Sequence, residues 1–335
     1  MMVGSEGATD GTGTSGPGDS SRPIVLIAAE LRTLLPDDPI PGHELVWIED
    51  RDPTPEGGYV ALISLLRRRL GEKEFEGLPK LKVLAQCAVG YDNIDLAAAA
   101  RRGVIVTNTP DVLTESTADL TWALILAVAR RLKEGQEMVA GGAWKGWTPT
   151  QLLGLELKGA VLGVVGAGRI GQAVARRAVG FRMNILYTDQ EPRLELETAI
   201  GASPRDLPDL LAASDVVTVH VPSTPSTRGL FNRERFGQMK PGALFINTAR
   251  GDLVDETALL AALEEGRLGG AGLDVFAREP DVPPELANHP KVLALPHIGS
   301  ATTHTRREMA ELAIRNARAV LAGKDPITPV STGTR

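Results

Sequence analysis

Three side chains that can bind an anion or move a proton follow short apolar runs in the last third of the chain. Arg250 follows the run in GALFINTARG, Glu279 lies in GAGLDVFAREP, and His297 lies in KVLALPHIGSA. An arginine holds a carboxylate through two parallel hydrogen bonds, a geometry that the single ammonium of lysine does not offer. A histidine paired with a carboxylate is favoured as imidazolium, which can donate a proton to a carbonyl oxygen. Together the three residues predict reduction of a 2-keto acid, with His297 as general acid and base.

Each residue also has an ordinary structural explanation. Arg250 could form a surface ion pair, Glu279 could be a solvated loop acid, and His297 could be a hydrogen-bonded histidine at the edge of a core. The strands of a parallel sheet share one carboxyl edge, and ligands bind just outside that edge. Three such residues following three predicted strands therefore favour a site over three unrelated surface contacts.

A glycine fingerprint for a dinucleotide lies near the middle of the chain. Residues 160–178 (AVLGVVGAGRIGQAVARRA) form an apolar run, a GxGxxG group and then a helical pattern. Gly166 permits a tight turn, Gly168 lets the backbone approach a pyrophosphate, and Gly171 allows the helix to pack closely on the strand. Asp189 ends the next strand, where a carboxylate accepts hydrogen bonds from ribose hydroxyls and repels a 2′-phosphate. The pattern predicts NAD and disfavours NADP; the alternative is a glycine turn without a ligand.

Two series of apolar runs supply the strands that must position these residues. Near-continuous Val, Ile and Leu runs indicate strands of a parallel sheet that is covered on both faces. The first series comprises residues 23–29, 43–49, 59–66, 81–88 and 103–109. The second series comprises residues 160–166, 183–189, 215–222, 242–249, 270–276 and 291–298. Each series, with its intervening helices, predicts a doubly wound α/β unit, and the second predicts a Rossmann domain.

Two longer helical patterns join and close the units. Residues 111–133 are predicted to form one helix, which Thr114 or Ser116 could cap. This helix is apolar on several faces, which favours packing both on its own domain and on a partner subunit. Residues 303–321 form an amphipathic pattern, and we expect this last helix to return and cover the first unit.

The predicted architecture is therefore α/β, with one domain inserted in the other. A Rossmann NAD-binding domain over residues 111–299 interrupts a flavodoxin-like substrate domain over residues 23–110 and 300–327. The polar stretch 1–22, rich in Gly, Ser and Thr, is predicted to be a disordered tail, and residues 328–335 a second tail.

At these residues the sequence resembles the D-isomer-specific 2-hydroxyacid dehydrogenase family, over nearly all of the chain outside the tails. NTARG, LDVFAREP and PHIGSAT match the motifs that supply the family's arginine, glutamate and histidine, here Arg250, Glu279 and His297. VGYDNID is similar to the family's substrate loop, in which the N–H groups of Val89 and Gly90 help to bind the carboxylate. The resemblance implies an NAD-dependent enzyme that interconverts a small 2-keto acid and a D-2-hydroxy acid.

The resemblance also extends the predicted cofactor site beyond the glycine fingerprint, with Asp274 expected at the nicotinamide amide. The residues predicted to bind the cofactor are Thr117, Gly166, Gly168, Arg169, Ile170, Gly171, Asp189, His220, Val221, Pro222, Thr227, Thr248, Ala249, Asp274 and His297.

Residues 112–132 and 141–159 are similar to the glyoxylate/hydroxypyruvate reductase branch, which favours glyoxylate or hydroxypyruvate as substrate. In the second segment, Trp144 is the candidate for a substrate contact; it or Trp147 could reach a partner's site, or both could pack at a dimer interface. We expect a homodimer through the 111–155 region. Many reductases of this branch resemble NADPH users, whereas the acidic Asp189 favours NADH here.

Composition limits the other possible functions. The net charge is -6 and offers no basic face for nucleic acid; the triplet Arg67–Arg69 is interpreted as a solvated helix end. The single cysteine, Cys87, is predicted to be a buried thiol in a cytoplasmic protein without disulfides. No apolar stretch is long enough to span a membrane, and the five histidines show no spacing for a metal site.

A second hypothesis is a non-catalytic scaffold that senses NAD, resembling the transcriptional corepressors related to these enzymes. The presence of all three catalytic residues favours the enzyme. Formate dehydrogenases resemble this layout but lack the acidic partner of the histidine. Phosphoglycerate dehydrogenases often carry an appended regulatory domain, and residues 326–335 are shorter than such a domain, so we do not expect one here.

Overall fold

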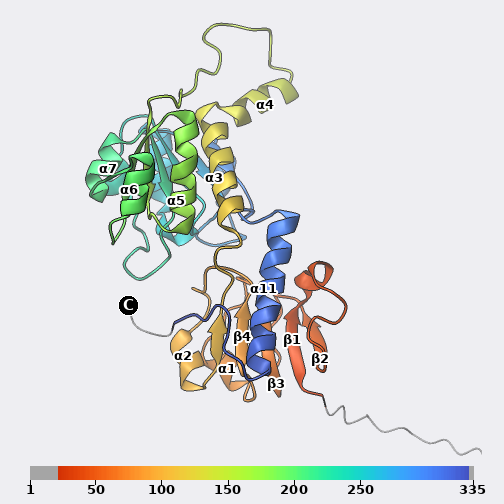
Figure 1. The fold of residues 1–335 in the computed structure, drawn as a ribbon. Helices are drawn as coiled ribbons and strands as arrows, with labels where there is room; N and C mark the ends of the chain where they lie inside the picture. The colour runs from red at the N-terminus through yellow and green to blue at the C-terminus, as the bar shows by residue number, and fades with distance from the viewer. Residues whose placement is uncertain (1–21, 332–335) are drawn as a thin grey trace, which may run out of the picture.

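The computed structural model describes residues 22–331 and contains two parallel sheets, each covered by helices on both faces (Figure 1). Nearly all of the predicted N-terminal tail, together with residues 332–335, lies outside the described residues. The two sheets confirm the predicted fold class of two doubly wound α/β units.

The first unit has five parallel strands in the order β2-β1-β3-β4-β5, which is the flavodoxin-like order. The strands are β1 (Ile24–Ala28), β2 (Glu44–Ile48), β3 (Tyr59–Ser64), β4 (Val83–Gln86) and β5 (Ile105–Thr107). The helices are η1 (Ala29–Leu34), α1 (Glu72–Glu76), α2 (Leu96–Arg101) and α11 (Thr303–Leu321). Val25 and Ile27 of β1 belong to the core that contains α11, whereas Leu26 faces the core with α1 and α2. Burial on both faces explains why this strand is apolar without alternation.

The last helix of the chain, α11, lies across β3 and β4 of the first sheet, as predicted (Figure 1). Thr302 caps it by accepting the N–H of Thr305 at 3.1 Å. The chain then returns along β5, where the N–H of Val330 donates to Val106 O at 2.8 Å. The described part of the predicted C-terminal tail is therefore bonded to the first unit.

The second unit has seven parallel strands in the order β12-β11-β10-β9-β6-β7-β8. They are β6 (Val161–Val165), β7 (Asn184–Thr188), β8 (Ser203–Pro204), β9 (Val216–Val219), β10 (Ala243–Asn247), β11 (Leu268–Leu273) and β12 (Val292–Ala294). One face is covered by α3 (Thr114–Ala129), α5 (Arg169–Ala178) and α6 (Leu194–Ile200). The other is covered by α7 (Leu207–Ala213), α8 (Arg233–Gln238), α9 (Glu256–Glu264) and α10 (Pro284–Ala287). Two short 3-10 helices are η2 (Val179–Phe181) and η3 (Gly251–Leu253).

The prediction of one helix over residues 111–133 is wrong, because α3 is followed by a separate helix, α4 (Leu132–Ala140). Arg131 has a left-handed φ of 53° at the break. Ala129 O accepts the N–H of Leu155 at 2.8 Å. This carbonyl would otherwise accept the N–H four residues later if the helix continued. Neither predicted cap forms: the Ser116 hydroxyl instead donates to Leu113 O at 3.1 Å.

The interpretation of Arg67–Arg69 as a solvated helix end is wrong for Arg68. Its side chain is buried in a turn, where it donates to Glu49 O at 2.6 Å and Asp52 O at 2.8 Å. Asp50 lies 3.7 Å away as its charged partner. A buried guanidinium of this kind satisfies loop carbonyls that would otherwise lack a donor.

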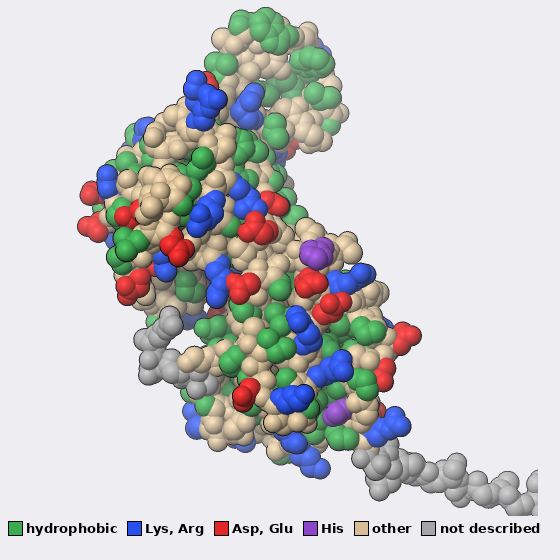
Figure 2. Space-filling view, viewed as in Figure 1, with side chains coloured by type: hydrophobic (Ala, Val, Ile, Leu, Met, Phe, Trp, Pro, Cys, Tyr) green, Lys and Arg blue, Asp and Glu red, His purple; other side chains and the backbone are tan. Residues whose placement is uncertain are grey.

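The surface and the core can be compared with the composition of the chain. Acidic and basic side chains are interspersed on the visible face, without a contiguous basic patch (Figure 2). Cys87 is buried, and burial raises the pKa of its thiol to about 12. Within residues 22–331, no helix combines the length and apolar content of a membrane span, and no cluster of three or more His, Cys, Asp or Glu could ligate a metal.

Candidate active site

Strand register brings the predicted residues to one edge of the second sheet. Val165 at the end of β6 pairs with Thr188 of β7 and Val219 of β9. The next residue of each strand is therefore a predicted cofactor residue, namely Gly166, Asp189 or His220. On the other half of the sheet, Asn247, Leu273 and Ala294 align at the ends of β10, β11 and β12. Arg250, Asp274, Glu279 and His297 follow these three adjacent strands.

His297 and Glu279 form a hydrogen-bonded pair, with 2.8 Å between His297 Nδ1 and Glu279 Oε2. The other carboxylate oxygen accepts the N–H of Phe276 at 3.0 Å. Burial raises the pKa of Glu279, but the hydrogen bond and charge of His297, together with the Phe276 N–H and the charge of Arg250, outweigh it, so this pKa lies below its usual value. Among the described residues, His297 Nε2 has no hydrogen-bond partner. One nitrogen is thus held by the carboxylate and the other is free to exchange a proton.

Asp274 holds the turn that carries His297. Its two carboxylate oxygens accept the N–H groups of Ile298 and Gly299, both at 2.7 Å. The side chain is almost fully buried, and burial raises its pKa. The Cβ that an alanine would add at Gly299 would lie 3.2 Å from Asp274 Oδ2 and 3.4 Å from Thr117 Cγ2. Asp274 and Thr117, both predicted as cofactor contacts, therefore meet beside the His297 turn.

Arg250 is brought to the same place by its neighbour Gly251. A Cβ at Gly251 would overlap the backbone of Phe276, so only glycine allows these two loops to touch. The carbonyl of Arg250 accepts Nδ2 of Asn247 at 2.8 Å, which fixes the backbone at the end of β10. The charge of Arg250 also contributes to the low pKa of Glu279.

The side chain of Arg250 reaches across to the first unit. Its Nε donates to Asp92 Oδ1 at 2.9 Å, and its Nη1 donates to Ala249 O at 2.7 Å. Gly90 lies so close to Nη2 that a Cβ there would overlap it. The predicted substrate residues Val89, Gly90 and Arg250 are therefore neighbours.

Several hydrogen-bond donors without an acceptor lie at the contact between Arg250 and the first unit. Within the described part of the chain, the N–H groups of Val89 and Gly90 and the Nη2 of Arg250 have no acceptor. Val89 O accepts Asn108 Nδ2 at 2.8 Å. Because a trans peptide directs its N–H opposite to its carbonyl, the Gly90 N–H points away from Asn108.

The glycine fingerprint has the geometry of a dinucleotide site. Gly166 has φ of 93° and lies against the backbone of His220 and Val221. Gly171 lies against Gly166 O, where a Cβ would overlap. A Cβ on Gly168 would meet nothing within 4 Å, so the space above the start of α5 is open. These residues fit a bound pyrophosphate.

Asp189 points back to the glycine loop. Its Oδ2 accepts the N–H of Ala167 at 2.7 Å, and its Oδ1 accepts the N–H of Gln190 at 2.7 Å. Arg193 Nη2 lies 3.1 Å from Oδ1. The carboxylate therefore has a cationic partner, the first arginine downstream of it in the sequence.

The other predicted cofactor residues lie along the same edge. Burial lowers the pKa of His220 to about 3, and Thr218 Oγ1 lies 2.9 Å from its Nε2. The Thr227 hydroxyl donates to Pro222 O at 2.7 Å. Thr248, next to Ala249, has its hydroxyl 2.9 Å from that of Thr121 in α3.

Two fingerprint residues make contacts that the sequence did not indicate. Arg169 forms an ion pair with Asp111 at the start of the connection between the units. Ile170 packs against the apolar cores of both units. Its partly buried side chain therefore contacts both units.

Trp144 lies outside the site of its own chain. It is 54% exposed, and Trp147 is 81% exposed, in the loop that follows α4. This loop projects away from both sheets (Figure 1). A substrate contact by Trp144 is therefore possible only in a partner subunit, and stays a prediction.

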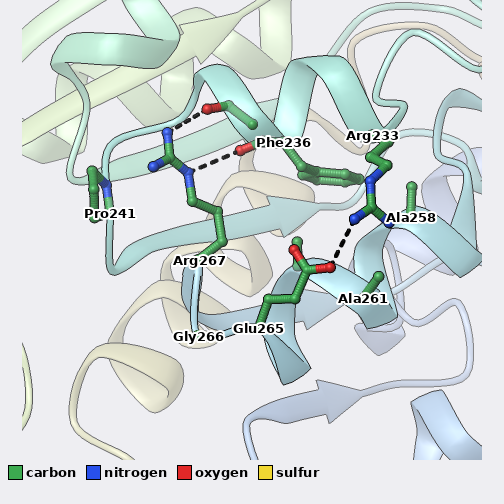
Figure 3. A pocket seen from close by; sticks show the side chains of 10 residues that line it. Arg233, Phe236, Pro241, Ala258, Ala261, Glu265, Gly266 and Arg267 are labelled. Carbon is green, nitrogen blue, oxygen red and sulfur yellow. Dashed lines mark hydrogen bonds and ion pairs between the residues drawn. The ribbon is translucent and has the colours of Figure 1, made fainter.

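A surface pocket lies elsewhere on the second unit, between α8 and α9 (Figure 3). Arg233 donates to Glu265 at 2.8 Å, and Arg267 donates to Phe236 O at 3.5 Å. Both guanidinium groups are thus engaged by the protein. None of the predicted site residues lines this pocket.

The comparisons with known proteins identify the family of this chain. Residues 122–299 match the model of the D-isomer specific 2-hydroxyacid dehydrogenase NAD binding domain. A glyoxylate reductase of Pyrococcus furiosus is 47% identical over 296 residues, which cover 85% of this chain and 88% of the relative.

Two solved structures have the same fold. The NADPH-dependent glyoxylate/hydroxypyruvate reductase of Sinorhizobium meliloti, in complex with NADP and malonate, is 36% identical with a TM-score of 0.84, covering 93% of this chain and 97% of that one. The D-lactate dehydrogenase of Aquifex aeolicus, complexed with NAD and lactic acid, is 29% identical with a TM-score of 0.78, covering 90% and 96%. The chain therefore belongs to the D-isomer-specific 2-hydroxyacid dehydrogenase family, and is an oxidoreductase that acts on the CH–OH group of 2-hydroxy acids.

Proposed function

We propose that this enzyme reduces glyoxylate or hydroxypyruvate to the 2-hydroxy acid with NADH, using His297 as general acid. The observation that carries the proposal is the group of free donors on Val89, Gly90 and Arg250 beside the His297–Glu279 pair. The relatives named glyoxylate reductase support glyoxylate as the substrate.

The substrate carboxylate binds between the two units. It accepts hydrogen bonds from the Nη groups of Arg250 and from the N–H groups of Val89 and Gly90. Donors from both units then hold one small anion, so that the keto group lies toward the His297 turn. We propose residues 23–110 and 300–327 as the substrate domain and residues 111–299 as the cofactor domain.

His297 supplies the proton. Its Nδ1–H donates to Glu279, which fixes the ring and stabilises the imidazolium, and its free Nε2–H donates to the carbonyl oxygen. The nicotinamide, when bound, supplies the hydride to the carbonyl carbon. The imidazole side chain is 34% exposed, so solvent can return the proton after each turnover.

NADH is the proposed cofactor because Asp189 follows β7, where its carboxylate would accept hydrogen bonds from the adenosine ribose. A 2′-phosphate there would meet this negative charge. Both NADP-bound and NAD-bound structures occur among the similar proteins, so the choice depends on the residues of this chain.

We propose a homodimer through the 111–155 region. Large apolar side chains are exposed on α4 and the following loop: Leu132, Val139, Trp144, Trp147 and Leu153. Burying them against a second copy would remove this area from water. In that assembly Trp144 of one subunit would limit substrate size in the other.

The free thiol of Cys87 is compatible with the cytoplasm, the location we propose.

Steady-state oxidation of NADH and NADPH with glyoxylate, hydroxypyruvate and pyruvate tests the function. We expect glyoxylate or hydroxypyruvate to be reduced with a preference for NADH. His297→Ala should lower kcat by on the order of 10²–10⁴-fold, while NADH binding, measured by fluorescence titration, stays near that of wild type. Tight NADH binding without turnover of any keto acid would favour the non-catalytic scaffold, and near-normal turnover by His297→Ala would remove His297 from the role.

A further inference from the structure

Asp92 is the acidic residue that contacts Arg250, although it belongs to the other unit. It lies in the loop after β4, and its Oδ1 accepts Nε of Arg250 at 2.9 Å. Nη1 donates to Ala249 O at 2.7 Å. Because Nε and one Nη1 proton are thus occupied, the terminal edge formed by Nη1 and Nη2 remains for a carboxylate.

The loop that carries Asp92 is anchored on both sides. Asn93 Nδ2 donates to Arg68 O at 2.7 Å, and its Oδ1 accepts Gln86 Nε2 at 2.9 Å. Asp95 caps α2 by accepting the N–H of Ala98 at 2.9 Å. The backbone around Asp92 is therefore held by the hydrogen bonds at Asn93 and Asp95 after it and by the Asn108 contact to Val89 O before it.

The contact also has features that an ordinary surface ion pair lacks. The side chains of Arg250 and Asp92 are 23% and 37% exposed. Nη2 is seated over Gly90, where a Cβ would collide with it. The hydrogen bonds that hold the Asp92 loop and the absence of a Cβ at Gly90 thus fix the position of the Arg250 guanidinium. A long side chain held in this way loses less conformational freedom when it binds a ligand.

We infer that Asp92 is a positioning residue for Arg250. It holds Nε so that the Nη1–Nη2 edge faces the substrate carboxylate beside the N–H groups of Val89 and Gly90. Because Asp92 and Arg250 belong to different units, the anion site is complete only when the two units are in contact. This inference rests on the proposed role of Arg250 in binding the substrate carboxylate.

Steady-state kinetics of Asp92→Ala and Asp92→Asn with glyoxylate and NADH test the inference. Asp92→Ala should raise KM for glyoxylate on the order of 10-fold, the effect of losing one hydrogen bond to a charged group, and change kcat much less. Asp92→Asn keeps an oxygen acceptor for Nε and should recover part of the loss. Glu76→Ala removes the same charge from an ion pair of the first unit and should keep the wild-type KM.

A double-mutant cycle separates positioning from general stabilisation. Because Asp92 acts through Arg250, adding Asp92→Ala to Arg250→Ala should cause no further loss of kcat/KM. Melting temperatures of the single variants should stay close to that of wild type. An unchanged or lower KM in Asp92→Ala, or fully additive losses, would overturn the inference.

The outcome for Asp92 is separable from the proposed function. If wild type reduces glyoxylate, Arg250→Ala loses saturation and Asp92→Ala behaves as wild type, the function stands and the positioning role is wrong. If wild type reduces no 2-keto acid, the proposed function fails, and the role of Asp92 fails with it.

Discussion

At the scale of single residues, the His297–Glu279 pair makes the stability of the fold depend on pH. Nδ1 is bound to Glu279 and Nε2 is free. Since the pKa of Glu279 in the folded protein lies below its usual value, the pair stabilises the fold above the ordinary carboxyl range. That contribution is lost as the pH falls through the lowered pKa.

Glu279→Gln should therefore change both the rate profile and the stability profile. Without the carboxylate, the hydrogen bond that fixes the His297 ring is weakened, so the reductive kcat/KM should fall. The melting temperature should be lower than that of wild type near neutral pH, and the difference should shrink as the pH falls through the ordinary carboxyl range and vanish below the lowered pKa of Glu279. pH–rate profiles and thermal melts measure both effects; superimposable profiles would contradict the pairing.

Asp189→Ala should weaken NADH binding and give a relative gain for NADPH. The substitution removes the ribose acceptor and releases Arg193, which lies 3.1 Å from Asp189 and can then meet a 2′-phosphate. The ratio of kcat/KM for the two cofactors is the measurement. Adding Arg193→Ala to this variant should abolish the NADPH gain, and an unchanged ratio in Asp189→Ala would show that the ribose assignment is wrong.

At the scale of elements, two glycines have different roles. Gly251 allows two loops to pack closely, whereas Gly168 leaves open space for a ligand. Gly251→Ala places a methyl group in the backbone of Phe276 and should destabilise the fold by about 1–3 kcal/mol. It should also lower kcat/KM by separating the Arg250 and Glu279 loops. Gly168→Ala meets no protein atom and should leave the melting temperature unchanged, while weakening NADH binding measured by titration. Equal effects of the two substitutions on stability would contradict this distinction.

The strands and the last helix could be predicted from sequence because their signals are local. β8 was missed because Ser203–Pro204 is too short to show a periodicity. The break after α3 was missed because Leu155, far along the chain, takes the carbonyl of Ala129. That Arg250, Glu279 and His297 lie at one sheet edge could be predicted because they follow strand ends, whereas Asp92 meets Arg250 through a contact between distant segments. Local patterns contain no information on such contacts.

At the scale of the whole molecule, the exposed apolar side chains beyond α3 predict an assembly. The Val139 side chain lies on α4 and is 63% exposed. Val139→Glu should convert the proposed dimer to a monomer, because the substitution would bury a charge in the interface. Leu194→Glu is the control, since Leu194 is equally apolar and exposed but lies at the start of α6. Sedimentation equilibrium distinguishes the states; a monomeric wild type would contradict the proposal.

The placement of α11 has a consequence for synthesis on the ribosome. The first sheet is translated early, but the helix that covers β3 and β4 comes from residues 303–321, after the whole second unit. At typical elongation rates this delay is on the order of ten seconds or more. The apolar face that includes Val25, Ile63 and Ala85 must wait that long for its cover. The nascent second unit can complete its sheet first, so the unit that begins the chain is the last to be finished.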